Sequence, residues 1–532
     1  MSEEKFYDSG VGPKVMGASR SPQDVTAIEL MTNFGSNPSR EPLRVTRFPV
    51  SIEEFAKLKS QATKKRPAPK GVKGIKIQED LSSELETKSA EKAEYDPTSG
   101  QMQAPAILAS FQSIQQTAFR PPDSTIAVGP ADVMVAVNTT MAVYSKTGTG
   151  TLRFTWDFNT MFRPVLPAGA RLFDPVLAYD HYSNRWIVVL VATRGNPQGA
   201  WYLVGVSQTS NAAGGYWVWA LDATLDGSTP SNNWADYPHL GFDFRAIYIT
   251  ANMFRFGGNF SYVKLRILNK SQLYSGGAVG WYDFWNLKNP DGSLSFTVQP
   301  CVHFTGIPTT PVNVPVYLIN AQWPGGSSLT KWTLLNPLAS PTLSRTAVNC
   351  MAYNLAPDGQ QLGTSVLIET NDSRLLCAIY QFSTSGERRL WTCHTVGHTW
   401  SGTSTSVSVL QWYEIDVTTN TVVEQGLFGA RGKYYFFPAI QTNISRDAFI
   451  VFGRSSSTEY AQLRQTGKRS TAPLNALEPS ALIKAGEGLY TGRRWGDYFG
   501  ICRDPSDPKI VWMNGEYAET GDTWGTWTCS TK

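Results

Sequence analysis

Seven short β-type runs recur along this chain at intervals of about 54 to 72 residues. They lie at 133–138, 186–192, 246–251, 315–321, 375–382, 448–453 and 510–515. Each run is apolar on both faces, so each strand should be covered on both sides. The strands of a β-propeller have this environment because neighbouring blades sandwich them. The spacing predicts an all-β fold, a seven-bladed β-propeller. Six blades is the alternative count, because the first strand before the run at 315–321 is the weakest.

Composition agrees with this fold class and excludes several functions. Of the 532 residues, 17% are charged and 12% aromatic, and 45 Gly and 32 Pro supply many turns. A net charge of +4 gives no reason to expect nucleic acid as a partner. No segment is long and apolar enough for membrane insertion. The first residues lack the apolar core of a standard signal peptide, so the protein either stays inside the cell, leaves it by another route or rides on a larger particle. Of these, we expect an extracellular, cell-surface or particle-borne location reached without a standard signal peptide.

The first hundred residues differ from the rest. Residues 1–100 lack periodic apolar runs, which predicts an extended, largely disordered arm, and residues 101–532 are assigned to the propeller. One short helix is expected near 52–60, because Ser51 and Glu54 form a capping box. The apolar run at 104–112 precedes the first repeat, and we expect it to supply the outer strand of the last blade. Such an N-terminal strand would close the ring and remove an open edge.

Four repeats open with an Asp at the start of the expected first strand: Asp123, Asp174, Asp236 and Asp497. First strands line the axis of a propeller, so these carboxylates are expected around one mouth of the channel. A carboxylate ring suits Ca²⁺, a cationic ligand or acid–base chemistry. Calcium is the one ion considered, and no other cofactor is predicted. The structural interpretation, in which each Asp holds backbone amides and joins one blade to the next, is favoured because the residue repeats.

The densest polar and aromatic cluster comes from 493–498 together with 514–517. It supplies Arg494, Trp495, Asp497, Tyr498 and Glu516. Aromatic faces stack on sugars, and Arg or carboxylate groups bind hydroxyls and acids. Two carboxylates such as Asp497 and Glu516 could also hydrolyse a glycoside if they faced a cleft. The alternative is a packing cluster between blades.

Six cysteines lie in the second half of the chain, and none belongs to a C-x-x-C motif. A hairpin with its turn centred on Ser385 would place Cys377 opposite Cys393. A cross-strand disulfide then competes with two buried free thiols.

Four motifs carry a resemblance to a known group: PPDSTIAVGP (121–130), LFDPVLAYDHYSNRW (172–186), DYPHLGF (236–242) and RWGDYFGICRDPSDP (494–508). Together they resemble poorly characterised microbial β-propeller proteins that are described as sialidase-like or as secreted surface propellers. The resemblance covers about residues 105–532 and implies an architecture. The true sialidase motifs, a complete Asp box and Phe-Arg-Ile-Pro, are absent, and no arginine triad is assigned.

Three functional hypotheses follow. The leading one is a non-catalytic binding or structural propeller that presents a rigid, aromatic-rich face to a glycan or protein. The second is a glycoside hydrolase or lyase with its carboxylates at the channel mouth. The third is an assembly component whose N-terminal arm binds a partner or a neighbouring copy.

Overall fold

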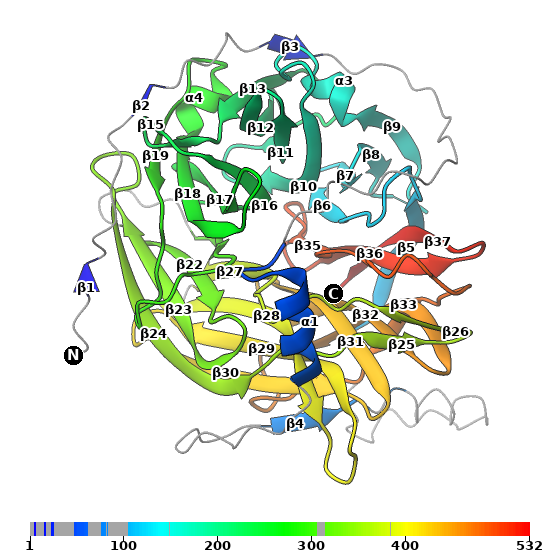
Figure 1. Ribbon diagram of the computed structural model, residues 1–532. Helices are drawn as coiled ribbons and strands as arrows, with labels where there is room; N and C mark the ends of the chain where they lie inside the picture. The colour runs from blue at the N-terminus through cyan, green and yellow to red at the C-terminus, as the bar shows by residue number, and fades with distance from the viewer. Residues whose placement is uncertain are drawn as a thin grey trace.

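Four-stranded antiparallel meanders follow one another around a central axis in the computed structural model of this protein (Figure 1). The structure describes residues 5–6, 15–16, 23–25, 47–61, 76–80, 82, 105–147, 149–305, 314–383 and 385–532. Helices are few and short: α1 (Ile52–Gln61), α3 (Phe158–Phe162) and α4 (Lys270–Tyr274). The protein therefore has an all-β, propeller-type arrangement.

Five separate sheets of four or five strands form blades. The first contains β6 (Thr125–Val128), β7 (Asp132–Val137), β8 (Thr140–Ser145) and β9 (Leu152–Asp157). The second contains β10 (Arg171–Asp180), β11 (Arg185–Gly195), β12 (Gln198–Ser207) and β13 (Tyr216–Asp222), with β3 (Gln23–Val25) at its edge. The third contains β20 (Gln299–Pro300), β22 (Val316–Ala321), β23 (Gly326–Leu335) and β24 (Thr342–Tyr353), with β1 (Lys5–Phe6) at its edge.

The other two separate blades come from the C-terminal part of the chain. One contains β31 (Lys433–Thr442), β32 (Ala448–Ser456), β33 (Glu459–Lys468) and β34 (Ala481–Lys484). The other contains β35 (Gly500–Arg503), β36 (Val511–Glu519), β37 (Thr523–Thr531) and β5 (Ile107–Gln115). Two small ribbons, β14 (Leu225–Asp226) with β15 (Thr229–Pro230) and β25 (Gly359–Gln361) with β26 (Thr364–Ile368), complete the short sheets.

A sixth, eleven-stranded sheet corrects the expected blade count. It joins the meander β16 (Asn233–Phe242), β17 (Ala246–Arg255), β18 (Phe260–Asn269), β19 (Gly280–Phe284) to the meander β27 (Cys377–Phe382), β28 (Arg388–Thr399), β29 (Ser406–Asp416), β30 (Thr421–Gly429). The link is β21 (Val302–Phe304), which pairs in parallel with both β16 and β27. The structure therefore has five separate blades, not seven or six, because β21 fuses the strands expected to form separate units.

The recurring apolar runs occupy equivalent strands in six of the seven cases. Those six coincide with the second strands β7, β11, β17, β22, β32 and β36, whereas the run at 375–382 coincides with the first strand β27. The unit judged weakest has a first strand, β20, of only two residues. The periodic signal therefore marks one largely buried strand of each repeat, which is usually but not always the second.

The core lies between the sheets. Apolar side chains from adjacent blades form continuous buried clusters, and six of the fully buried side chains are tryptophans: Trp186, Trp219, Trp332, Trp412, Trp495 and Trp524. The aromatic content that suggested an exposed ligand face is thus largely used in blade packing. No helix in the described part of the chain is long and apolar enough to cross a bilayer.

The ring closes with a strand from before the first repeat. β5 pairs antiparallel with β37, and Ser110 lies opposite Cys529. The Ile114 amide also donates to Thr526 Oγ1 at 2.8 Å. The expected closure by an N-terminal strand is therefore confirmed. In this blade β5 is the outer strand, and it comes from the opposite end of the chain to β35, β36 and β37.

The described pieces of the arm lie along blade edges and over the ring. β1 pairs with β24, β2 (Val15–Met16) with β19, β3 with β13 and β4 (Lys76–Glu79) with β30. Figure 1 shows β1, β2 and β3 along the rim and α1 near the middle of the ring. In α1 the Glu54 amide donates to Ser51 Oγ at 3.1 Å, as in a capping box. Most of the expected disordered arm lies outside the described residues.

The hairpin register around Ser385 is the expected one. Cys377 lies directly opposite Cys393 between β27 and β28. The two Sγ atoms are 3.9 Å apart, and both residues are free thiols in the structure. The sequence therefore predicted the pairing of the strands, and the disulfide alternative is not the state that the structure holds.

Candidate functional site

The channel mouth is the end of the ring at which the first strands begin, and a repeated backbone turn shapes it. One residue near the start of each of six first strands has a left-handed conformation, with φ between 51° and 58°: Asp123, Asp174, Tyr237, Thr297, Asn371 and Phe437. Register shifts in β10, β16 and β31 coincide with this turn. Such bulges redirect side chains at the ends of strands. The repeated turn therefore places one residue of each repeat at the mouth.

The left-handed turn points its backbone N–H toward the preceding blade, where a side chain accepts it. Asp174 N donates to Asn138 Oδ1 at 2.9 Å, and Tyr237 N donates to Asp174 Oδ2 at 3.1 Å. Thr297 N donates to Asn252 Oδ1 at 2.9 Å. Each bond satisfies a buried donor and links two neighbouring units. Repetition of this contact is what the structural interpretation of the Asp residues required.

Two of the four predicted Asp residues, Asp123 and Asp174, accept hydrogen bonds from backbone amides of other repeats. Asp123 Oδ2 accepts from Asn138 Nδ2 at 2.7 Å, while its Oδ1 accepts from the Asp497 amide at 2.8 Å. Asp174 holds the Tyr237 amide. Asp236, by contrast, immediately precedes the left-handed Tyr237 and so stands one residue before the position of Asp174, and neither Asp497 nor Tyr498 has a left-handed backbone. The four are near one another but not equivalent.

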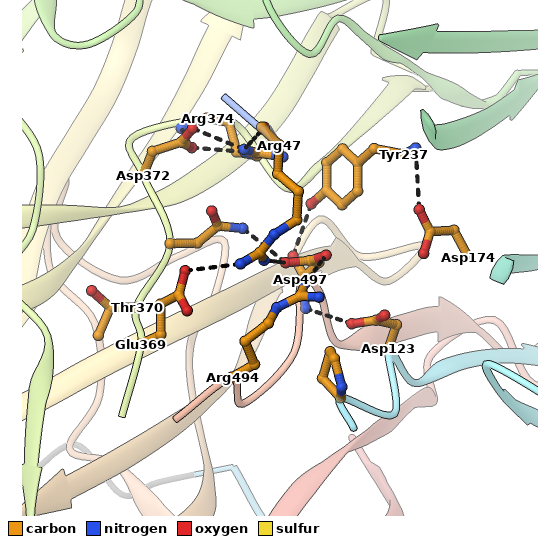
Figure 2. Close-up of polar contacts among 12 residues, drawn as sticks. Arg47, Asp123, Asp174, Tyr237, Glu369, Thr370, Asp372, Arg374, Arg494 and Asp497 are labelled. Carbon is orange, nitrogen blue, oxygen red and sulfur yellow. Dashed lines mark hydrogen bonds and ion pairs between the residues drawn. The ribbon is translucent and has the colours of Figure 1, made fainter. Parts of the chain in front are cut away.

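Asp497 is the ionised centre of the mouth (Figure 2). Its carboxylate accepts from Arg494 Nη2 at 2.7 Å and from Asn371 Nδ2 at 3.1 Å, and Arg47 Nη1 lies 3.5 Å away. Burial alone would raise the pKa of Asp497, but the guanidinium groups of Arg494 and Arg47 outweigh it and lower the pKa. Asp497 therefore carries a negative charge at neutral pH.

The neighbouring carboxyl groups behave in the opposite way. Burial, reinforced by the charge of Asp497, raises the pKa of Asp123 to about 7 and that of Asp236 to about 6. Burial followed by nearby Asp236 raises the pKa of Asp174 well above its ordinary value. Burial and Asp123 do the same for Glu516, and neither Glu516 oxygen has a hydrogen-bond partner among the described residues. The mouth thus combines the ionised Asp497 with neighbouring carboxyl groups whose pKa values are raised.

The predicted aromatic residues of this cluster are packed away. Trp495 is fully buried, with its ring edge-on to Tyr490 at 5.0 Å between centroids. Tyr498 is buried as well and donates its hydroxyl to Pro175 O at 2.7 Å. Neither ring presents a free face on which a sugar could stack. Both contacts fit the packing-cluster alternative.

A segment from outside the propeller covers the mouth. This docked segment, residues 47–61, places Arg47 Nη2 3.2 Å from Glu369 Oε1 and reaches Asp497 with Nη1. Figure 2 shows the Arg47 side chain extending between the two carboxylates. Behind it, Phe48 and Phe55 stack at 3.6 Å between centroids and are both buried. Lys59, farther along α1, pairs with Asp358.

Arg374 joins the docked segment to the floor of the mouth. It is held by Asp372 in a two-point contact, with Nε–Oδ1 at 2.7 Å and Nη2–Oδ2 at 2.9 Å. Its Nη2 also donates to the Arg47 carbonyl at 3.2 Å. Its guanidinium lies over the rings of Tyr237 and Phe296 at 4.7 and 4.8 Å. A cation sandwiched in this way is well suited to hold an incoming backbone.

Sequence reasoning missed Arg47, Glu369, Asn371, Asp372 and Arg374. A signal for the last three existed, because residues 371–374 precede an apolar run just as the four Asp residues do. The apolar run at 375–382 resembles the second strands of the other repeats, and this hides the equivalence between residues 371–374 and the four Asp residues. Arg47 carried no local signal, since its partners are hundreds of residues away.

Within the described residues, no group of three or more His, Cys, Asp or Glu side chains is placed to hold a metal ion. Three of the mouth carboxylates considered for Ca²⁺, those of Asp123, Asp174 and Asp497, bind amide or guanidinium groups instead. Calcium binding at this ring remains a prediction without a set of converging ligands to support it.

Comparison with known proteins finds similarity to solved structures at low identity and low TM-score. No protein-family model and no curated protein matches the chain. Among solved structures, an α-L-arabinofuranosidase, Arb93A of Fusarium graminearum, is 9% identical with a TM-score of 0.33, covering 65% of this chain and 89% of its own. A mutant Trypanosoma rangeli sialidase is 10% identical with a TM-score of 0.35, covering 80% and 60%. A quinohemoprotein alcohol dehydrogenase of Comamonas testosteroni is 9% identical with a TM-score of 0.34, covering 75% and 65%.

Proposed function

We propose that the protein is a non-catalytic binding or structural propeller whose channel mouth receives a segment of a protein ligand. The observation that carries this proposal is the docked segment, in which Arg47 bridges Glu369 and Asp497. A mouth that already binds a cationic, aromatic stretch of chain has the chemistry to bind another. Of the two ligand classes expected from the sequence, glycan or protein, the burial of Trp495 and Tyr498 favours protein. We further propose an extracellular, cell-surface or particle-borne location.

The electrostatic balance of the mouth supports a cationic ligand group. Two carboxylates, Glu369 and Asp497, converge on the Arg47 guanidinium, whereas Arg374 and Arg494 are occupied by Asp372 and Asp497. Charge-assisted pairs of this kind give both affinity and orientation. A ligand that replaced Arg47 would therefore need a positive group followed by an apolar one, in place of Phe48.

A peptide-binding experiment tests the proposal. The probe is a labelled peptide with the sequence of residues 47–61, and the receptor is the full chain with Phe55→Ala, which loosens the internal copy. We expect saturable binding, and binding about tenfold or more weaker for the same peptide carrying Arg47→Glu. Equal binding of the two peptides, or none of either, would contradict the proposal. A glycan array with and without calcium, run on the same variant, would reassign the ligand if it showed selective binding.

A glycoside hydrolase or lyase is the second candidate, and the contrast between Asp497 and its neighbours favours it. Acid–base chemistry uses an ionised carboxylate beside a carboxyl group of raised pKa, and Asp497 and Asp123 form such a pair. This hypothesis requires that Asp497→Asn and Glu516→Gln abolish turnover of a glycan substrate while the fold is kept. Full activity in both variants would show that this site assignment is wrong.

An assembly role is the third candidate, and the edge pairing of β1, β2, β3 and β4 favours it. Each adds to the outer strand of a different meander. The same backbone pairing could be made with a neighbouring copy. Protease protection of the arm only in an assembled state would support this role, and equal digestion in both states would count against it.

A further inference from the structure

A blind cavity of about 350 Å³ runs along the propeller axis below the mouth. Its walls are the inner faces of the first strands, and most of them are apolar, including Ile126, Leu240, Val302 and Ile379. This volume lies at the lower end of the range for small-molecule pockets, which is about 300–1,000 Å³. The cavity is separate from the mouth carboxylates, because none of the four Asp residues at the mouth lines it.

Hydrogen bonds across the ring close the cavity at the mouth end. Tyr237 donates its hydroxyl to Asp497 O at 2.8 Å, and Tyr498 donates to Pro175 O at 2.7 Å. Below them, Gln299 Nε2 donates to Leu375 O at 2.7 Å. All three side chains are buried. A ligand would therefore enter from the opposite end, where Phe304, Pro505 and Pro508 are only partly buried.

At that opposite end lies Arg503, a cation whose hydrogen bonds and ring contact are all with neutral groups. Its Nε donates to Thr442 O at 2.8 Å, and its Nη2 reaches Thr442 Oγ1 and Asn443 O at 3.3 Å each. The guanidinium lies 3.9 Å from the centroid of the Phe304 ring. Within the described residues no carboxylate forms an ion pair with it, and its hydrogen bonds are made by Nε and Nη2.

The acidic side chain among the cavity-lining residues, that of Asp504, already has other partners than Arg503. Asp504 pairs with Lys146 at 2.7 Å and accepts from Trp512 Nε1 at 2.9 Å. His181 lines the same end, but burial lowers its pKa to about 4, so it is neutral at pH 7. Burial also lowers the pKa of Arg503 to about 9. One positive charge is therefore left without a counter-charge at the entrance of an apolar cavity.

We propose that this channel binds a small monocarboxylate with an aliphatic tail, the carboxylate resting on Arg503 and the tail lying along the apolar walls. A single uncompensated guanidinium matches a single negative charge, and planar carboxylates suit its geometry. The apolar walls, closed at the far end, favour a tail without polar groups. This site is independent of the ligand proposed for the mouth.

Calorimetric titration of the full chain tests the proposal with three probes that share one tail: decanoate, decan-1-ol and decylamine. We expect decanoate to bind with one site per chain, and the alcohol and amine to bind at least about tenfold more weakly. Arg503→Gln should weaken decanoate binding by about 10- to 100-fold, while Arg503→Lys should recover part of it. Arg388→Gln is the matched control, because Arg388 also lies over a phenyl ring, that of Phe382, but outside the cavity.

Each outcome decides the matter. Decanoate-selective binding that is lost in Arg503→Gln and kept in Arg388→Gln supports the site. Equal binding of all three probes would mean that the charge plays no part, and absence of binding would mean that the cavity takes no such ligand. Either result overturns the proposal. If Arg503→Gln does not fold, the comparison of decanoate with decan-1-ol on the unaltered chain gives the decision alone.

Discussion

At the scale of one residue, Glu516 shows how burial raises the pKa of a carboxyl group near the mouth. Its side chain is 0% exposed and neither oxygen has a hydrogen-bond partner among the described residues. A carboxylate in such a place would be costly, so the residue holds its proton in the folded protein. In the unfolded chain the same group titrates near its ordinary value of about 4.3. Folding and protonation are therefore linked at this position.

Replacement of Glu516 by Gln should remove that link. A raised folded-state pKa stabilises the fold below the unfolded pKa, and this contribution is lost as pH rises toward the folded pKa. Glu516→Gln should therefore become more stable relative to the unaltered protein by about 1.4 kcal/mol for each pH unit above about 4.3. Urea unfolding between pH 5 and pH 7 (roughly one to three units above that value) measures the difference. The control is Glu53→Gln, an exposed side chain of α1; a difference that stays constant with pH in both variants would contradict this account.

Much of the residue-level picture was accessible from the sequence, and the rest depends on register. The sequence brought Asp123, Asp174, Asp236 and Asp497 to one mouth, because each stands at the start of a first strand. It did not show that Asp236 stands one residue before the left-handed position, or that Asp497 has no left-handed residue beside it. A shift of one residue turns a side chain to the other face of a strand, and composition alone does not encode it.

At the scale of an element, the docked segment behaves as an addition to the propeller. Its apolar contacts form a small cluster of their own, in which Phe48, Phe55 and Leu355 are buried and Trp323 packs against them. The helix α1 contributes one buried side chain, Phe55. So small a cluster can open while the ring stays closed.

Phe55→Ala should therefore release the docked segment without unfolding the blades. Phe55 is 6% exposed, and removal of a ring this well buried costs about 3–5 kcal/mol. Hydrogen exchange should show faster exchange in 47–61 and unchanged exchange in β27 and β36. Ile52→Ala, 51% exposed on the same helix, is the matched control and should leave both unchanged. A loss of protection throughout the blades would mean that the segment is part of the main core.

The position of the docked segment could not be predicted, although its helix could. The capping box of Ser51 and Glu54 is local, and local patterns are readable from sequence. The place where the helix docks depends on pairs such as Arg47 with Asp497, which are 450 residues apart. No periodicity in the chain records such a pair.

At the scale of the whole molecule, the closing strand decides whether the ring is one cooperative unit. Phe111, at the middle of β5, is 5% exposed and lies 5.2 Å from the Tyr144 ring in the first blade. This contact ties the last blade to the first, so the two ends of the array support each other. The closure was predictable because an apolar run was left over before the first repeat. The fusion of two meanders by β21 was not predictable, because the composition of a three-residue strand does not show which strands it pairs with.

Phe111→Ala should destabilise the entire ring. We expect a loss of about 3–5 kcal/mol in the free energy of unfolding, seen as an earlier single transition in urea. Leu108→Ala changes the same strand at a side chain that is 54% exposed, and it should shift the transition little. If Phe111→Ala altered only the exchange of β5 and left the midpoint in place, the ring would not depend on its closure.

The same closure sets an order of events during synthesis. The hydrogen bond from Ile114 in β5 to Thr526 in β37 cannot form until Thr526 has been synthesised, 412 residues later. At about 5–20 residues per second, the ribosome needs roughly 20 to 80 s to produce the partner strand. Throughout that interval the nascent chain carries an unpaired apolar edge that other nascent chains could join. The demand for a chaperone should therefore fall on β5, which is made before the first repeat and pairs only after the last strand is complete.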